Sequence, residues 1–180
     1  MNTKNLTLIG VMSAVLCILG PWSLAIPLSP VPVSLGMLAV YLTAYILGMK
    51  KGTVSVAVYL LLGTMGLPVF TGFGGGIGKV LGPTGGYMLG YLFMGLTVGF
   101  AADRWRTNYA RIFSAMLAGT ALCYLFGSLW LARTGGMSFG AALGAGALPF
   151  IPGDLVKMAV ALVVGTQVKK RLWHAGILEQ

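Results

Sequence analysis

Charged side chains are scarce in this sequence, and carboxylates are the scarcest of them. Only 8% of the 180 residues are charged and 57% are hydrophobic, whereas about 25% of the residues in a soluble domain are charged. The chain contains three acidic residues, namely Asp103, Asp154 and Glu179. This composition excludes an ordinary soluble domain and predicts an integral membrane protein.

Histidine and cysteine are almost absent too. The one histidine, His174, lies in a basic tail, and Cys17 and Cys123 lie in separate apolar segments, where we interpret them as small buried residues. Without a cluster of His, Cys and carboxylate side chains, we predict no metal site and no cofactor. The sequence also lacks a second intramembrane carboxylate and a Ser-His pairing, so we expect no enzymatic activity.

Nucleotide-binding motifs are missing as well. Gly78-Lys79 resembles part of a phosphate-binding loop, but that motif needs glycine where this chain has Phe73, and serine or threonine where it has Val80. The formal net charge of +9 comes from short basic groups between apolar runs. This pattern is typical of membrane loop anchors and not of a nucleic-acid-binding surface.

Long apolar runs make up most of the chain. A membrane-spanning helix needs about 20 apolar residues, or about 17 when it is short, so 180 residues allow six spans in one domain, residues 1–180. We therefore predict an all-α integral membrane protein, a bundle of six transmembrane helices at residues 6–20, 33–49, 53–67, 87–102, 112–131 and 154–168. Residues 133–150 are expected to form a short helix or a re-entrant segment. The first run also resembles a signal peptide, but its removal would leave an odd number of spans.

The distribution of Lys and Arg residues indicates the orientation of this bundle. With both termini in the cytoplasm, nine basic residues lie on the cytoplasmic side and two lie outside, which is a strong positive-inside bias. The cytoplasmic set is Lys4, Lys50, Lys51, Arg104, Arg106, Arg111, Lys169, Lys170 and Arg171, and the outer set is Lys79 and Arg133. The same orientation brings residues 21–32, 63–87 and 149–157 together at the outer face.

Two of these outer segments are expected to have an irregular backbone. Residues 21–32 contain four prolines, which forbid a continuous helix. Residues 63–87 are rich in glycine, which lets backbone N-H groups approach a ligand closely. Irregular backbone at membrane depth is tolerated only where it is buried in protein or lines a cavity. We therefore predict ordered outer loops over a ligand cavity, with the proline-rich segment as a lid.

An acid and a base stand together at the start of the last apolar run. Asp154 and Lys157 are three residues apart, so on a helix that begins near Gly153 they share a face. Ionisable groups inside a membrane are costly and usually mark a substrate or ion site. The alternative is that Asp154 caps the helix and Lys157 extends to the interface. The convergence of three cavity-like segments at the outer face favours a binding site.

The residues near this pair indicate what the cavity binds. Lys79, Lys157 and the positive end of the last helix suit an anionic group such as a carboxylate, and Asp154 accepts hydrogen bonds from ligand N-H or O-H groups. Phe70 and Tyr87 are expected to surround a hydrocarbon part, although Tyr87 also fits an anchor at the membrane interface. The prediction is a small, partly apolar, anionic metabolite with an amide-like head.

Four motifs occur in a fixed order along the chain. They are Pro-Val-Pro-Val-Ser (30–34), Gly-Leu-Pro-Val-Phe (66–70), Gly-Pro-Thr-Gly-Gly-Tyr (82–87) and Pro-Phe-Ile-Pro-Gly-Asp followed by Lys three positions later (149–157). In this order they resemble the BioY proteins, the biotin-specific substrate-binding (S) components of energy-coupling factor (ECF) transporters. The resemblance implies a protein of a prokaryotic cell membrane that captures biotin from outside. It also implies two kinds of partner, a transmembrane coupling subunit and a pair of ATP-hydrolysing subunits.

The resemblance and the outer-face features together give a set of predicted site residues. The predicted substrate-binding residues are Ser34, Phe70, Gly75, Gly76, Lys79, Thr84, Tyr87, Asp154 and Lys157. Ser34 and Gly36 stand where the family is expected to carry threonine and a nearby glutamine. On the first helix, Gly10 and Ala14 nearly match the Ala-xxx-Ala motif with which the family contacts the coupling subunit. Ordinary packing within the chain is the alternative for this pair.

Another class of transporter fits some of the same features. A self-sufficient facilitator or proton-coupled secondary transporter, for biotin or another small carboxylate, would use Asp154 as its proton carrier. A channel is not expected, because the sequence contains no repeated ring of charges and no filter-like segment.

Overall fold

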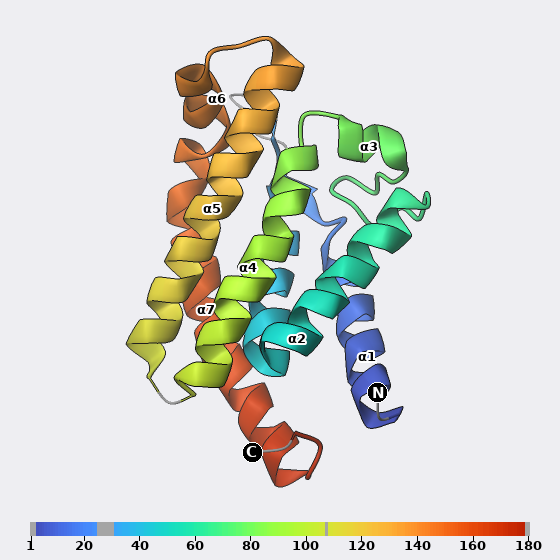
Figure 1. The fold of residues 1–180 in the computed structure, drawn as a ribbon, viewed down its shortest axis with the longest axis vertical. Helices are drawn as coiled ribbons and strands as arrows, with labels where there is room; N and C mark the ends of the chain where they lie inside the picture. Colours follow the sequence, from blue (N-terminus) through green and yellow to red (C-terminus); the bar gives the residue numbers. More distant parts are fainter. Residues whose placement is uncertain (1–2, 25–30, 107, 179–180) are drawn as a thin grey trace.

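The computed structural model describes residues 3–24, 31–106 and 108–178, and this part of the chain is mainly helical (Figure 1). Two short strands, β1 (Ser23–Leu24) and β2 (Val33–Ser34), pair antiparallel. The helices are α1 (Thr3–Leu19), α2 (Gly36–Thr64), α3 (Ile77–Leu81), α4 (Gly85–Arg104), α5 (Tyr109–Gly135), α6 (Phe139–Gly146) and α7 (Ile151–His174), with a 3-10 turn at Leu148–Phe150. Residues 25–30, which belong to the predicted proline-rich lid, lie outside the described residues.

Four helical segments are long and apolar enough to cross a membrane. They are Gly36–Thr64, Gly85–Arg104, Tyr109–Gly135 and Phe139–His174. Helix α1 is apolar but shorter, with 17 residues. The predicted class, a helical protein with several membrane spans, is confirmed at this level. The segment 133–150 contains the short helix α6, which is one of the two forms expected for it.

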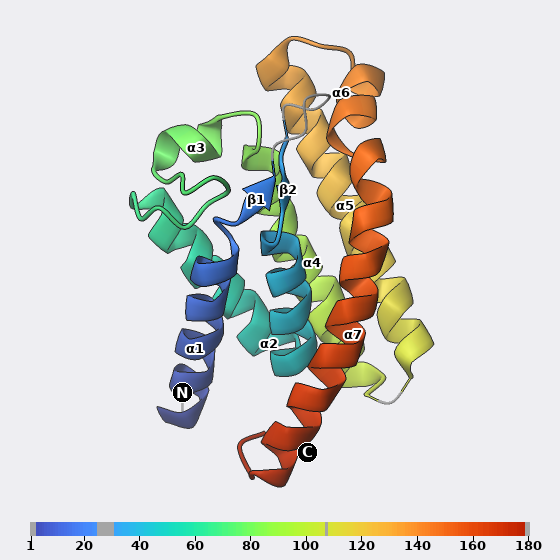
Figure 2. The same ribbon diagram turned by 180° about the vertical axis from the view of Figure 1, so that it is seen from behind.

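Helix α2 contains both of the helices that were predicted at 33–49 and 53–67. Its backbone leaves the helical conformation at Gly48, where φ is 78°, and Figure 2 shows the chain turning back at this point. The Asp103 carboxylate accepts a hydrogen bond of 2.9 Å from the Met49 N-H, and so satisfies one of the free donors at the start of the second half. At Gly52 an added Cβ would lie 2.9 Å from Ala44 Cα, so the two halves approach too closely for a larger residue.

Replacing Gly48 with alanine is expected to lower the thermal unfolding midpoint of the purified protein in detergent. Gly48 combines φ 78° with ψ −175°, a region that is essentially restricted to glycine and costs other residues about 1–3 kcal/mol, and the new Cβ would also collide with the Asp103 carboxylate. Gly144→Ala is the matched control, because Gly144 lies in α6 with nothing near its Cβ position. Equal midpoints for the two variants would contradict this account of the kink.

Helix α4 is the centre of the bundle, packed between α2 and α5 (Figure 1). Glycines allow these helices to approach closely, as is usual inside membranes. An added Cβ at Gly90 would lie 2.7 Å from Cys123 Cα, and one at Gly99 would lie 2.5 Å from Met49 Cα. Helices α1 and α7 pack against α2. Both termini lie at one end of the molecule, and α3, α6 and the β1–β2 pair lie at the other.

Candidate ligand-binding site

A cavity opens at the end of the bundle that carries α3, α6 and the β1–β2 pair. It encloses about 580 Å³, counting its open mouth. Several segments that are distant in sequence contribute to its wall, and most of the lining is apolar or aromatic. The lining residues are Val31, Pro32, Val33, Ser34, Met37, Tyr59, Thr71, Thr84, Tyr87, Met88, Tyr91, Tyr124, Gly146, Phe150, Asp154 and Lys157.

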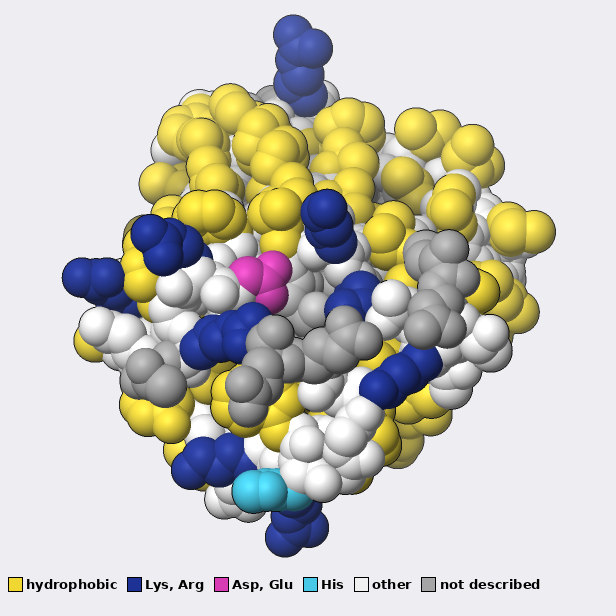
Figure 3. Space-filling view, turned by 60° about the horizontal axis from the view of Figure 1, so that its bottom comes forward, with side chains coloured by type: hydrophobic (Ala, Val, Ile, Leu, Met, Phe, Trp, Pro, Cys, Tyr) yellow, Lys and Arg dark blue, Asp and Glu magenta, His cyan; other side chains and the backbone are white. Residues whose placement is uncertain are grey.

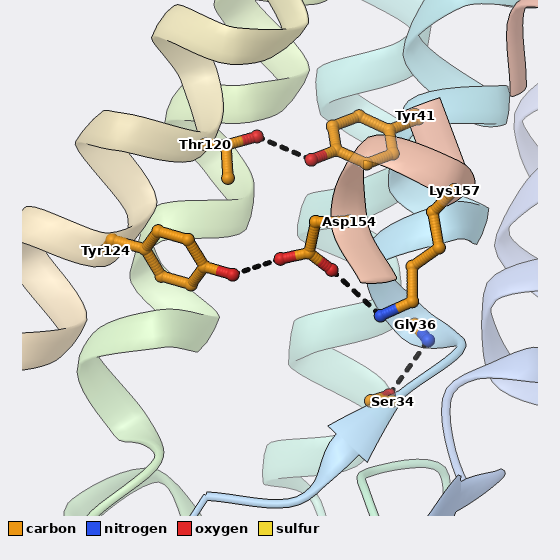
Figure 4. Close-up of polar contacts among 7 residues, drawn as sticks. All are labelled: Ser34, Gly36, Tyr41, Thr120, Tyr124, Asp154 and Lys157. Atoms are coloured by element: carbon orange, nitrogen blue, oxygen red, sulfur yellow. Dashed lines mark hydrogen bonds and ion pairs between the residues drawn. The ribbon is translucent and has the colours of Figure 1, made fainter. Parts of the chain in front are cut away.

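Asp154 and Lys157 form an ion pair in the cavity wall, drawn in Figure 4. Lys157 Nζ lies 2.9 Å from Asp154 Oδ1, and the side chains of Asp154 and Lys157 are only 3% and 12% exposed. The second carboxylate oxygen, Oδ2, accepts a hydrogen bond from the Tyr124 hydroxyl of α5. Buried charges need partners of this kind. The carboxylate is therefore held in one orientation by α5 and α7, with lone pairs left for a ligand.

The helix start explains why Asp154 does not act as a cap. Helix α7 begins at Ile151, and its N-cap residue is Phe150, which makes no side-chain capping bond. Asp154 is the fourth residue of the helix, and its carboxylate bonds to side chains. The capping alternative therefore does not describe this residue. The position in the first turn still places its negative charge at the positive end of the helix dipole.

A second polar contact fixes α2 to α5 next to the ion pair. Tyr41 Oη and Thr120 Oγ1 are 2.5 Å apart, and both side chains are buried (Figure 4). Because a lost bond between two buried hydroxyls is costly, this contact stabilises the position of α5. Helix α5 in turn carries Tyr124, so the contact supports the Asp154 site.

Two other hydroxyl groups in the cavity lining, those of Ser34 and Thr84, differ in whether they are already bonded. Ser34 Oγ donates to the Gly20 carbonyl at 3.2 Å and accepts the Gly36 N-H at 2.8 Å. Thr84 Oγ1 is buried, and no atom of the described residues forms a hydrogen bond with it. A buried hydroxyl without a partner is costly and rare. Thr84 is therefore the better candidate of the two for a ligand contact.

The predicted residue Tyr87 lies in the cavity wall, buried between helices. Its ring meets the Tyr124 ring edge to face, with centroids 6.4 Å apart. A side chain at Gly146 would collide with the Tyr87 hydroxyl, and one at Gly127 would collide with its ring. Glycine at both positions is therefore what allows Tyr87 to pack here. An anchoring position at the membrane surface does not describe this buried ring.

Four predicted residues from the glycine-rich segment do not line the cavity. Phe70 is fully buried, meets the Tyr59 ring at 5.5 Å, and fills the space that Gly63 leaves. Gly76 has a φ of 85°, and its N-H donates to the Gly63 carbonyl at 2.7 Å. A Cβ at Gly75 would collide with the Leu67 carbonyl. These three residues shape the loop beside the cavity.

Lys79 is the fourth of these residues. It lies in the short helix α3, half-buried, and its aliphatic stem lies against Gly74, where an added Cβ would be 3.2 Å from Lys79 Cε. The structure thus brings five of the nine predicted substrate-binding residues together in the cavity, namely Ser34, Thr84, Tyr87, Asp154 and Lys157.

Three further tyrosines of the cavity lining were not anticipated from the sequence. Tyr59, Tyr91 and Tyr124 all face the cavity, although each lies inside an apolar helical run. A tyrosine in the middle of a membrane span is a usable signal, because its hydroxyl needs a partner in a site without water. The pairing of Tyr124 with Asp154 depends on how α5 and α7 are aligned, which the sequence does not express.

Gly10 and Ala14 lie on an exposed face of α1. Both are exposed, and no atom outside the helix lies within 4 Å of the Cβ position at Gly10. A neighbouring face of the helix packs against α2, where the Ser13 hydroxyl donates to the Ser55 carbonyl at 3.1 Å. The two small residues therefore take no part in packing among the described residues.

Metal-binding side chains are not grouped in the described part of the chain, where no three His, Cys, Asp or Glu residues come together.

Comparisons with known proteins agree with the geometry of a binding protein. The BioY family profile matches residues 1–174. The biotin transporter BioY of Thermotoga maritima is 37% identical over 167 residues, which cover 93% of this chain and 96% of that protein. The probable biotin transporter BioY of Pyrococcus horikoshii is 36% identical over 169 residues, covering 94% of this chain and 98% of its own.

The fold has a close counterpart among solved structures. The crystal structure of the S-component for biotin from an ECF-type ABC transporter superposes with a TM-score of 0.86 at 32% sequence identity, covering 93% of this chain and 92% of that one. The sequence match and the structural match extend over nearly the whole chain. The chain therefore belongs to the BioY family.

Proposed function

We propose that this chain is the biotin-binding S component of an ECF transporter, which captures biotin at the outer face of a prokaryotic cell membrane. The observation that carries the proposal is the cavity in which the Asp154–Lys157 pair faces an apolar, aromatic wall, in a chain that belongs to the BioY family. No covalent chemistry is needed for this role. Capture and release of an unchanged ligand are sufficient.

Biotin has a polar ring group and an apolar part, which match the Asp154–Lys157 pair and the apolar lining of the cavity. Its cyclic urea offers two N-H donors and one carbonyl acceptor, and these complement the Asp154 carboxylate and the Lys157 ammonium. Its thioether ring and hydrocarbon chain fit against Met37, Met88 and Phe150 in the cavity lining. We assign the unpaired Thr84 hydroxyl to the chain's carboxylate, as a donor at the start of α4.

Six membrane crossings follow if the kink at Gly48 divides α2 into two crossing segments. The crossings are then α1, the two halves of α2, α4, α5 and α7. With the basic residues on the inner side, both termini lie in the cytoplasm and the cavity opens outward. The position of both termini at the end opposite the cavity supports this orientation (Figure 1).

The exposed pair Gly10 and Ala14 supports the requirement for partner subunits. Small residues on a membrane helix let a second helix approach closely, and this face of α1 has no neighbour among the described residues. We assign it to the transmembrane coupling subunit, which acts together with two ATP-hydrolysing subunits.

Titration of the purified chain with biotin tests the proposed ligand. Trp22 is 59% exposed and meets Phe73 edge to face at 6.1 Å beside the loops, so loop ordering on binding is expected to change tryptophan fluorescence. Biotin and desthiobiotin, which share the urea ring, should give saturable changes, whereas lipoate, which lacks it, should not. Trp22→Phe identifies the origin of the signal. A saturable response to lipoate equal to that of biotin would contradict the role of the Asp154–Lys157 pair.

Self-sufficient transport is the competing function, and reconstitution separates the two. Vesicles that contain only this chain are expected to bind biotin without accumulating it. Sustained accumulation driven by a pH gradient would instead support a proton-coupled transporter with Asp154 as the proton carrier.

A further inference from the structure

A second cavity lies at the opposite end of the bundle, near both termini. It encloses about 530 Å³, counting its mouth, between α2, α4, α7 and the segment that follows α4. Its wall carries three cations, Lys51, Arg106 and Lys169, and one acid, Asp103. Figure 3 shows this face, with Lys and Arg side chains around acidic atoms. We call this cavity the basic hollow, and it shares no lining residue with the biotin cavity.

The charges of the basic hollow are not balanced among the described residues. Among the described residues, the one ion pair within 4 Å joins Asp154 and Lys157 in the other cavity. None of the three cations in the basic hollow therefore lies that close to the Asp103 carboxylate. The Asp103 carboxylate is directed instead to the Met49 N-H at the kink of α2. Among the described residues, three positive charges therefore line a space to which one acid, Asp103, contributes, and that acid already binds the Met49 N-H.

The two lysines keep N-H donors for which no described residue is an acceptor. Lys169 Nζ donates to the carbonyls of Tyr45 and Ala102 at 3.1 and 3.4 Å, which leaves one of its three N-H donors. Lys51 Nζ donates to Asn5 at 3.4 Å, which leaves two. The Arg106 guanidinium lies 6.0 Å from the centre of the Trp173 ring. Converging ammonium and guanidinium donors are the usual way to bind the oxygens of a phosphate group.

The other wall of the basic hollow is apolar. Ile46 and Leu47 of α2 contribute to it, and the Trp173 ring, 36% exposed, lies at its rim. Tryptophan prefers the boundary between the membrane and water. A site at the boundary between membrane and water that combines cations with apolar surface suits a ligand that carries a phosphate next to a hydrocarbon chain. Basic pockets between membrane helices on the cytoplasmic side bind lipid head groups in this way.

We propose that the basic hollow binds the phosphate group of an anionic phospholipid at the inner surface of the membrane. One phosphate there would connect Lys51 in the second half of α2, Arg106 after α4, and Lys169 in α7. A bound lipid would therefore hold together three segments that meet next to the Gly48 kink. This site requires the inward orientation of the termini, but it does not depend on which ligand the outer cavity takes.

The test is the retention of defined lipids by the purified chain, measured by native mass spectrometry and by the thermal unfolding midpoint in neutral detergent. Dioleoylphosphatidylglycerol is expected to be retained more strongly than dioleoylphosphatidylcholine at the same ionic strength, and to raise the midpoint further. Arg106→Gln and Lys51→Gln should each reduce this preference about fivefold, since each basic residue near the surface contributes about 1 kcal/mol. Arg104→Gln is the matched control, because Arg104 is exposed two residues away and does not line the basic hollow.

Two results would overturn the proposal. One is equal retention of the two lipids, and the other is an equal loss of preference in Arg104→Gln and Arg106→Gln, which would mean a diffuse surface charge. Addition of inorganic phosphate separates the two sources of the phosphate group. Lipid retention should persist in millimolar phosphate, whereas displacement by phosphate but not by chloride at matched ionic strength would reassign the site to a soluble phosphate.

Discussion

Replacing Asp154 with asparagine is expected to weaken biotin binding about a hundredfold, because removing one partner of a buried, hydrogen-bonded charge pair costs about 2–5 kcal/mol. The asparagine would keep the shape of the side chain. It would present an amide N-H₂ group where the urea N-H groups of biotin need an acceptor, and it would leave Lys157 without its counter-charge. Lys157→Met should also weaken binding, for the reciprocal reason.

Tyr124 makes this prediction more specific, because its hydroxyl bonds to Asp154 Oδ2. Tyr124→Phe alone is expected to weaken binding about tenfold, as for the loss of one hydrogen bond to a charged group. In the Asp154→Asn background, the same change should cost little more, since Tyr124 acts through the carboxylate. The fluorescence titration with biotin measures all three variants.

Tyr45→Phe serves as the matched control for loss of a tyrosine hydroxyl. Tyr45 Oη bonds to Thr166 Oγ1 at 2.9 Å and lies outside the biotin cavity, so its removal should leave affinity unchanged. Unaltered biotin affinity in Asp154→Asn, with an unchanged unfolding midpoint, would remove Asp154 from the site. Additive losses from Tyr124→Phe and Asp154→Asn would show that Tyr124 does not act by orienting the carboxylate.

The Asp154–Lys157 pair illustrates what local spacing predicts well. Two residues three positions apart on a helix share a face whatever the rest of the chain does, and the structure places their charged atoms 2.9 Å apart. The hydrogen bond from the Tyr124 hydroxyl to Asp154 Oδ2 was not predicted, because it joins residues that are distant in sequence. Tyr124 is 30 residues away in sequence, and its contact depends on the relative depth of α5 and α7. Nothing in local periodicity expresses that depth.

The glycine-rich segment shows a different limit. Glycines there were interpreted as positions where a ligand approaches the backbone, but several serve the packing of the protein itself. Gly63 leaves room for the Phe70 ring, Gly75 lies against the Leu67 carbonyl, and Gly76 adopts a positive φ. Glycine permits close approach by any neighbour. Sequence alone does not distinguish a ligand from the next loop. The predicted ligand contacts of Phe70, Gly75, Gly76 and Lys79 therefore stay predictions, and none of these residues lines the cavity.

The kink in α2 lies at a residue that was predicted to be helical. Residues 50–52 were interpreted as the connection between helices at 33–49 and 53–67, whereas the backbone leaves the helical conformation at Gly48. The structure continues the helical hydrogen bonding on both sides and changes direction at a single residue. The Asp103 carboxylate from α4 makes this short turn stable by binding the Met49 N-H. A tertiary contact therefore determines a boundary that the local sequence leaves undefined.

Replacing both Gly10 and Ala14 with leucine is expected to reduce biotin uptake by the assembled transporter about tenfold or more and to leave biotin affinity unchanged. Both residues are exposed on α1, and no atom of the described residues outside the helix lies within 4 Å of the Cβ position at Gly10. Leucines there would hold a partner helix away from the close approach that small residues allow. Overpacking of an interface costs about 1–3 kcal/mol, so uptake should fall about tenfold or more.

Two measurements on the same preparation separate a partner surface from a structural role. Uptake of labelled biotin is followed in vesicles that contain the coupling subunit and the ATP-hydrolysing subunits, and affinity is measured on the isolated chain. Ala118→Leu is the matched control, because Ala118 is an exposed small residue on α5, and both uptake and affinity should be retained. Equal losses of uptake and affinity in the Gly10/Ala14 variant would mean that these residues stabilise the fold of the S component. Unchanged uptake would mean that the coupling subunit binds elsewhere, since a leucine pair at the contact would keep the two helices apart.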